Sequence, residues 1–162
     1  MIPVRVAAHP ALPSAPRPVP AYRRVLVPVS GHDSEAAVAI ACELAAEHGA
    51  AVTAVEVVEI PAELPLNALM PDEEQQARRA RAETQAVGDL YGITVTVRIV
   101  RARSAGPAIV EQAEATRAEL IVLRAPRKQR ASKRGAIFGG TASHVLTHAP
   151  CRVMVVTAPR RT

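Results

Sequence analysis

The chain has 162 residues, 49% apolar and 2% aromatic, so it can bury one core of Val, Ile, Leu and Ala but is short for two domains. The formal net charge is +5, but all acidic residues lie within 33–119 and basic residues concentrate at 124–134, unlike a broad nucleic-acid-binding face. No apolar run approaches the roughly 18 residues of a membrane span, and six prolines stand within the first twenty residues in place of a signal peptide, so we expect a soluble, cytoplasmic protein.

Three segments of different composition divide the chain. Residues 1–21 are rich in Pro and Ala without a sustained period, which predicts a disordered or loosely docked extension. Residues 22–158 alternate between strand and helix patterns and are expected to form one folded domain. A short basic tail, 159–162, follows it.

The first half of the domain begins with a strand, RVLVPV, that ends at Val29. Asp33 or Ser34 can cap the helix that follows, and Gly49 ends it. AVTAVEVV is the second strand, and a Pro-punctuated loop leads to a second helix that begins near Asp72 with an acidic first turn, as the helix dipole prefers.

The second half continues the alternation. The run ITVTVRIV at 93–100 alternates apolar and polar residues, which predicts a third strand with one wetted face at a sheet edge. A helix from about Ser104 to Ala115 and the strand LIVL come next. After the basic segment a last helix begins at Gly140 and Thr141, and CRVMVVT is the last strand.

Five strands alternating with four helices predict an α/β fold: a doubly wound, five-stranded parallel sheet in the order 3-2-1-4-5, with helices on both faces. Such sheets bind ligands in the crevice where the strand order reverses, between the carboxyl ends of strands one and four. Here those ends lead into Ser30 and into the basic segment 124–134, so an anion is the expected ligand.

A glycine pair marks the start of the last helix beside this crevice. The two glycines, Gly139 and Gly140, allow a ligand to approach the backbone closely, and the helix start offers free N–H groups. Thr141 adds a hydroxyl donor. These features suit the phosphates of a nucleotide. The alternatives are an ordinary helix start and, for the basic segment, a solvated surface loop without a ligand.

No catalytic or metal-binding motif is evident in the sequence. His144 and His148 have metal-ligand spacing, but Val145 stands where a zinc peptidase needs Glu, and no third ligand is apparent. Ser30 and its neighbours contain hydrolase residue types without a Gly-x-Ser-x-Gly elbow. We therefore expect neither a metal site nor an enzyme.

The domain resembles the universal stress protein family at both ends, through RRVLVPVSGHDSEAA and GGTASHVLTHAPCRVMVV. In the ATP-binding branch of that family, two glycines precede a Gly-Ser or Gly-Thr pair at fixed spacing, and an acidic residue ends strand one. The pair matches Gly140 and Thr141, the two glycine positions fall on Arg127 and Arg130, and the acid falls on Ser30.

The resemblance implies ATP or another adenine nucleotide as the ligand, with Pro28 and Val29 as pocket wall. Arginine cannot adopt the conformations of glycine, but it makes charge-assisted, forked hydrogen bonds to phosphate, so the site could have changed its ligand. Ligand-binding residues are expected at the following positions: Pro28, Val29, Ser30, Arg127, Arg130, Gly139, Gly140 and Thr141.

The last strand, Arg152 to Val156, is expected at a sheet edge, yet it is continuously apolar after its first residue and carries no protecting charge or proline. A second copy that pairs through the same strand would cover it and give a homodimer, which the resemblance also implies.

These features lead to two functional hypotheses. The first is non-catalytic binding of a nucleotide or related anion, with a regulatory role in the stress response and an unknown protein partner. The alternative is a nucleotide-independent dimeric interaction module whose basic loop contacts an acidic partner or an anionic membrane surface. Nucleic-acid binding is weaker, because aromatic stacking groups are nearly absent.

Overall fold

A computed structural model describes residues 21–30, 34–125 and 139–157. Most of the predicted extension, the basic segment beyond residue 125 and the tail lie outside these ranges. The elements in chain order are β1 (Arg24–Val29), α1 (Glu35–His48), β2 (Ala51–Glu59), α2 (Pro71–Leu90), β3 (Val95–Ala102), α3 (Ala105–Ala115), β4 (Leu120–Arg124), α4 (Gly139–His148) and β5 (Arg152–Val156).

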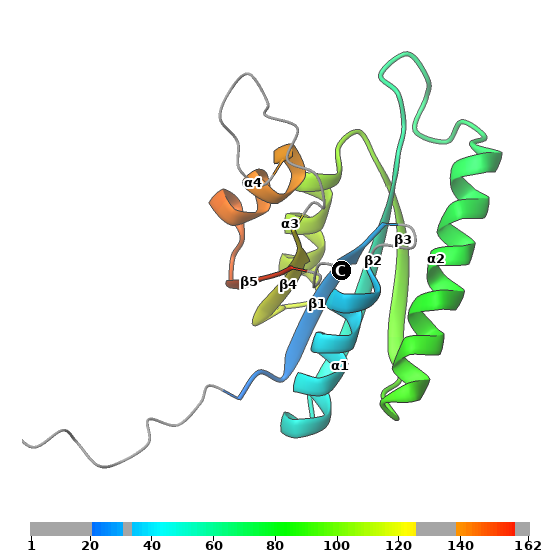
Figure 1. The fold of residues 1–162 in the computed structure, drawn as a ribbon. Coiled ribbons are helices and arrows are strands. Elements are labelled where there is room, and N and C mark those ends of the chain that lie inside the picture. The colour runs from blue at the N-terminus through cyan, green and yellow to red at the C-terminus, as the bar shows by residue number, and fades with distance from the viewer. Residues whose placement is uncertain (1–20, 31–33, 126–138, 158–162) are drawn as a thin grey trace, which may run out of the picture.

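The five strands form one parallel sheet in the order β3-β2-β1-β4-β5 (Figure 1). This is the order predicted from the alternation of strands and helices, and the two edges are β3 and β5. Because all strands run in the same direction, their carboxyl ends meet at one edge of the sheet, where the chain leaves β1 and β4 in opposite directions.

Helices cover both faces of the sheet, and each face has its own core (Figure 1). The β1 side chains alternate between the faces: Val25 and Val27 pack in the cluster with α1, whereas Leu26 packs in the cluster with α3 and α4. Small residues on α1, such as Ala37 and Ala41, are fully buried and let the helix approach the valines closely. An aliphatic core of the kind expected from the composition therefore positions the strand ends.

The third strand differs from its prediction. It begins at Val95 and runs to Ala102, two residues later at each end than the pattern indicated. The backbone N–H of Ile93 donates to the carbonyl of Gly88, so this residue belongs to the turn that closes α2. Ile99 lies on the apolar side of the predicted alternation but is 41% exposed.

The start of α1 also differs in one detail. Ser34 occupies the N-cap position, but its hydroxyl makes no capping hydrogen bond to the helix. The hydroxyl oxygen instead accepts from the backbone N–H of Ser30 at 2.8 Å. The Ser34 side chain thus holds the end of β1 beside the start of α1. Asp33, the other predicted cap, lies outside the described residues.

Two arginines near the end of β3 hold the loop between β2 and α2. The guanidinium of Arg101 pairs with Glu74 at 2.6 Å. It also donates to carbonyl groups of the loop, as Arg103 does; their carbonyl partners are Leu66 and Ala68 for Arg101, and Ile60, Pro61 and Leu64 for Arg103. These bonds anchor the start of α2 over the carboxyl end of β2. In the described part of the chain, no helix has the length and apolar character needed to cross a membrane.

Candidate functional site

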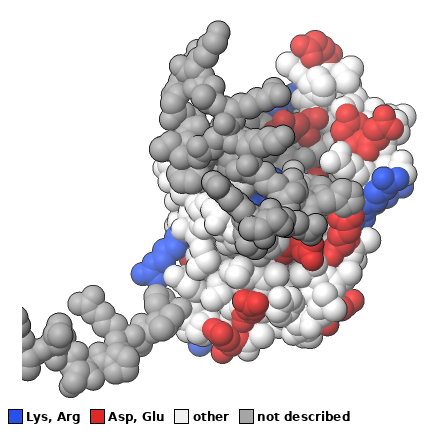
Figure 2. Space-filling view, viewed as in Figure 1, with Lys and Arg blue, Asp and Glu red and all other residues white. Residues whose placement is uncertain are grey.

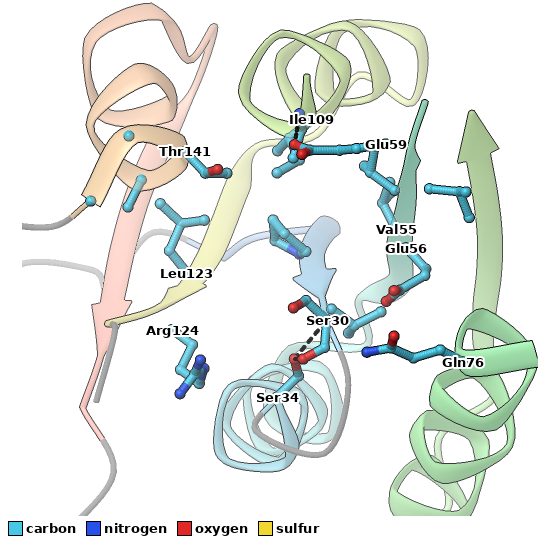
Figure 3. A pocket seen from close by; sticks show the side chains of 18 of the residues that line it. Ser30, Ser34, Val55, Glu56, Glu59, Gln76, Ile109, Leu123, Arg124 and Thr141 are labelled. Atoms are coloured by element: carbon cyan, nitrogen blue, oxygen red, sulfur yellow. Dashed lines mark hydrogen bonds between the residues drawn. The ribbon is translucent and has the colours of Figure 1, made fainter. Parts of the chain in front are cut away.

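A cavity of about 540 Å³ opens at the carboxyl ends of β1, β2 and β4, where the strand order reverses (Figure 3). Its volume lies within the range of about 300–1,000 Å³ that is usual for small-molecule sites. Apolar side chains from both core faces form much of its wall, and these are Pro28, Val29, Val55, Val57, Val58, Ile109 and Leu123.

Six of the eight predicted ligand-binding residues line this one cavity, although they come from the two ends of the domain. They are Pro28, Val29, Ser30, Gly139, Gly140 and Thr141. The other two, Arg127 and Arg130, lie outside the described residues. The topology therefore brings the end of β1 and the start of α4 together as the sequence indicated.

The start of α4 provides the donors for an anion. Gly139 has φ of 75°, in the left-handed region that glycine adopts without strain, and the helix begins from it. The first N–H groups of a helix have no partner within the helix and lie at its positive end. With the hydroxyl of Thr141 beside them, these groups suit a phosphate or another oxyanion.

Acidic and amide side chains line the opposite wall, which β2 and α2 form. Figure 3 shows Glu56 and Gln76 on this side of the cavity, with Arg124 and Thr141 across from them. Glu59 and Glu73 line the cavity as well. The cavity thus has a cationic and N–H-donating side on β4 and α4, and an acceptor-rich side on β2 and α2.

Glu56 is the unusual member of the acidic wall. Its side chain is only 7% exposed, and no partner within the described residues reaches its buried Oε2 atom. Removal from water disfavours the charged carboxylate, and this burial raises the pKa of Glu56 from its ordinary value of 4.5 to about 7. The carboxyl group is therefore half protonated near neutral pH.

Glu59 has a structural role. Its Oε1 accepts a hydrogen bond of 2.7 Å from the backbone N–H of Ala105, the first residue of α3. This carboxylate satisfies the positive end of α3, which would otherwise compete for an anion in the cavity. The start of α4 also lines the cavity, and its first N–H groups can meet an anionic ligand there.

The face of the molecule that α1 and α2 form carries many acidic side chains. On the face seen in Figure 2, acidic side chains are spread over the part of the molecule that α1, α2 and the loop before α2 form. This agrees with the acidic composition of the chain before residue 120. The distribution supports attraction of a local anion to the basic side of the cavity over attraction of a long phosphate backbone to the molecule.

The two helical histidines are not among the cavity-lining residues, and they contact each other. The rings of His144 and His148 stack with centroids 4.1 Å apart, and Nδ1 of His148 lies 2.9 Å from the carbonyl oxygen of His144. Among the described residues, no group of three or more His, Cys, Asp or Glu side chains could hold a metal ion.

Reasoning from the sequence missed the residues that β2 and α2 contribute. Glu56 carried a usable signal, because it is a lone carboxylate among valines in a strand that the fold buries on both faces. Gln76 and Glu73 carried none, because they stand among many polar residues of an amphipathic helix. Arg124 belongs to the basic segment that was expected at the crevice, but it was not named among the ligand-binding residues.

Comparisons with known proteins agree with this architecture. Among solved structures, UspA from Lactobacillus plantarum is 26% identical with a TM-score of 0.67, covering 85% of this chain and 99% of that chain. A universal stress protein from Archaeoglobus fulgidus, in complex with dAMP, is 18% identical with a TM-score of 0.66, covering 83% and 98%. Another universal stress protein, in complex with cAMP, is 23% identical with a TM-score of 0.61, covering 85% and 98%.

The sequence comparisons decide the family. No curated protein matches the sequence significantly. The sequence model of the universal stress protein family, however, matches residues 21–157, which is nearly the whole of the expected domain. With the sheet order and the cavity at its reversal point, this match establishes that the chain belongs to the universal stress protein family.

Proposed function

We propose that this chain binds an adenine nucleotide in the cavity without using it catalytically, and that the bound state changes its contacts with a regulatory partner in the stress response. The observation that carries the proposal is the start of α4, where Gly139 and Thr141 open onto a cavity with apolar walls. Such a cavity suits a ligand with an anionic end and a flat apolar end.

Each part of the nucleotide has a proposed position in the cavity. The phosphate lies at the start of α4, where the helix dipole and the Thr141 hydroxyl stabilise negative charge. Arg127 and Arg130 of the basic segment add charge-assisted hydrogen bonds to it. The base and sugar lie against the apolar wall that includes Pro28 and Val29, beside Ser30.

Two similar structures support this choice of ligand. The proteins in complex with dAMP and with cAMP share the fold, and both ligands are adenine nucleotides. Binding without covalent chemistry is favoured by the state of Ser34, because its hydroxyl is hydrogen-bonded to the backbone of Ser30 and to no side-chain base among the described residues.

The assembly that we propose is a homodimer through β5. This strand is at the sheet edge, and its residues after Arg152 are apolar and only partly buried within one copy. Pairing with a second copy would satisfy the edge and bury these side chains.

Calorimetric titration with AMP and ATP tests the nucleotide proposal. We expect wild-type protein to bind at least one of them, and Thr141→Val to weaken the binding about tenfold through loss of one hydrogen bond to a charged group. Thr147→Val is the matched control, because Thr147 lies on the same helix and its hydroxyl donates to the Ser143 carbonyl. Absence of binding at millimolar nucleotide, or equal affinity for both variants, would contradict the proposal.

A further inference from the structure

The cavity contains one buried group whose hydrogen-bonding capacity the described part of the protein does not use. Oε2 of Glu56 is buried and has no partner among the described residues. The neighbouring hydroxyl of Ser34 is bonded to the backbone of Ser30. In Figure 3 the carboxyl group of Glu56 lies between Ser30 and the side chain of Gln76, within the cavity wall.

A glutamate at this position is costly for the fold alone. β2 is otherwise made of Ala, Val and Thr up to its last residue, and Glu56 is paired in register with Val29 of β1 and with Ile99 of β3. Burying a polar group without a hydrogen bond is unfavourable, and a valine here would avoid that cost. A ligand in the cavity would supply the partner that the described residues do not provide.

Charged side chains on several elements lie at or near the cavity wall that contains Glu56. The cavity-lining residues described on β1, α1, α3 and α4 carry no charge. The charged side chains on the other elements are Glu59 of β2, Glu73 and Glu74 of α2, Arg101 of β3 and Arg124 of β4.

Three of these groups are bonded to described residues, and they are Glu59, Glu74 and Arg101. Arg101 is bonded to Glu74, and Glu59 to the start of α3. Burial alone accounts for the raised pKa of Glu56, which is about 7. A phosphate in the same cavity would disfavour the ionised form further, because like charges repel at short range.

We propose that the neutral carboxyl group of Glu56 recognises the adenine base, donating its O–H to a ring nitrogen and accepting a hydrogen bond from the exocyclic amine. A neutral carboxyl has one donor beside one acceptor, and adenine presents the complementary pair. Glu56 lies across the cavity from the start of α4, so a nucleotide with its phosphate at Thr141 directs its base toward this wall (Figure 3). This inference rests on the proposed function and identifies the residue that reads the base.

The test is calorimetric titration with cAMP from about pH 6 to about pH 8. A phosphodiester is the right probe, because a phosphate monoester itself titrates near pH 6 and would obscure the protein group. If only the neutral carboxyl binds, the neutral fraction falls about tenfold over this range for a group that titrates near pH 7, and the wild-type affinity falls with it.

Three variants or ligands sharpen the test. Glu56→Gln keeps one donor and one acceptor, so it should bind cAMP within a few fold of wild type at pH 6 and without pH dependence. Glu56→Ala should bind cAMP at least about tenfold more weakly than wild type does. The 3′,5′-cyclic phosphate of purine riboside lacks the amine. It should bind wild type about tenfold more weakly than cAMP does, and it should bind Glu56→Ala with the same affinity as cAMP.

The outcomes separate this inference from the proposed function. Tight cAMP binding that is independent of pH, or undiminished in Glu56→Ala, overturns the role of Glu56 and leaves nucleotide binding intact. Absence of binding by cAMP, AMP and ATP overturns both. If Glu56→Ala does not fold, the pH profile of Glu56→Gln against wild type decides the question alone.

Discussion

At the scale of single residues, the protein places a carboxylate where a valine would fold more easily. Glu56 is 7% exposed in the middle of a buried strand, while the acid that the family resemblance implied at the end of strand one is Ser30 here. Both residues line the same cavity, and Glu56 pairs in register with Val29, the residue before Ser30. In the proposed site, the adjacent strand therefore provides the carboxyl group that the resemblance implied on strand one.

The titration of Glu56 has a consequence for stability. Its folded-state pKa of about 7 exceeds the unfolded value of about 4.5, so the folded protein binds more protons between these values and loses stability as pH rises through them. Compared with Glu56→Gln, wild type should lose roughly 2 kcal/mol of unfolding free energy between about pH 5 and pH 8. Urea unfolding at several pH values measures this; a constant difference between the two proteins would contradict the raised pKa.

At the scale of elements, hydrophobic periodicity and turn residues predicted every strand and helix of the described domain, and the deviations have local causes. The pattern extended the third strand back to Ile93, because periodicity does not report the hydrogen bond that ties this residue to Gly88. Ser34 was correctly placed at a helix start. Its hydroxyl, however, accepts a hydrogen bond from the backbone N–H of Ser30 and does not cap the helix, which capping rules do not indicate.

The edge strand β5 carries the prediction about assembly. Val155 is partly buried and belongs to neither core cluster, so Val155→Glu should leave the monomer folded and place a charge in the proposed interface. Sedimentation should then report a dimer for wild type and a monomer for the variant. Thr96→Glu, on the opposite edge strand β3, is the matched control and should remain dimeric. A dimer that persists in Val155→Glu would contradict pairing through β5.

At the scale of the whole molecule, one cavity combines a side made by Arg124 and the start of α4 with an acceptor-rich side made by β2 and α2. The first side was expected from the sequence, because basic residues follow the fourth strand and a glycine pair stands at the start of the last helix. The sequence did not predict the second side, because only the folded sheet shows that β2 and α2 reach the same cavity. The roles of Arg127 and Arg130 remain predictions, since both lie outside the described residues.

The most direct test of the account is a crystal structure of the protein grown with saturating AMP. We predict density in the cavity, with the phosphate at the backbone N–H groups that follow Gly139 and the adenine amine within hydrogen-bonding distance of Glu56. An empty cavity, or a nucleotide bound at another surface, would contradict the claim that the reversal point of this sheet is a nucleotide site.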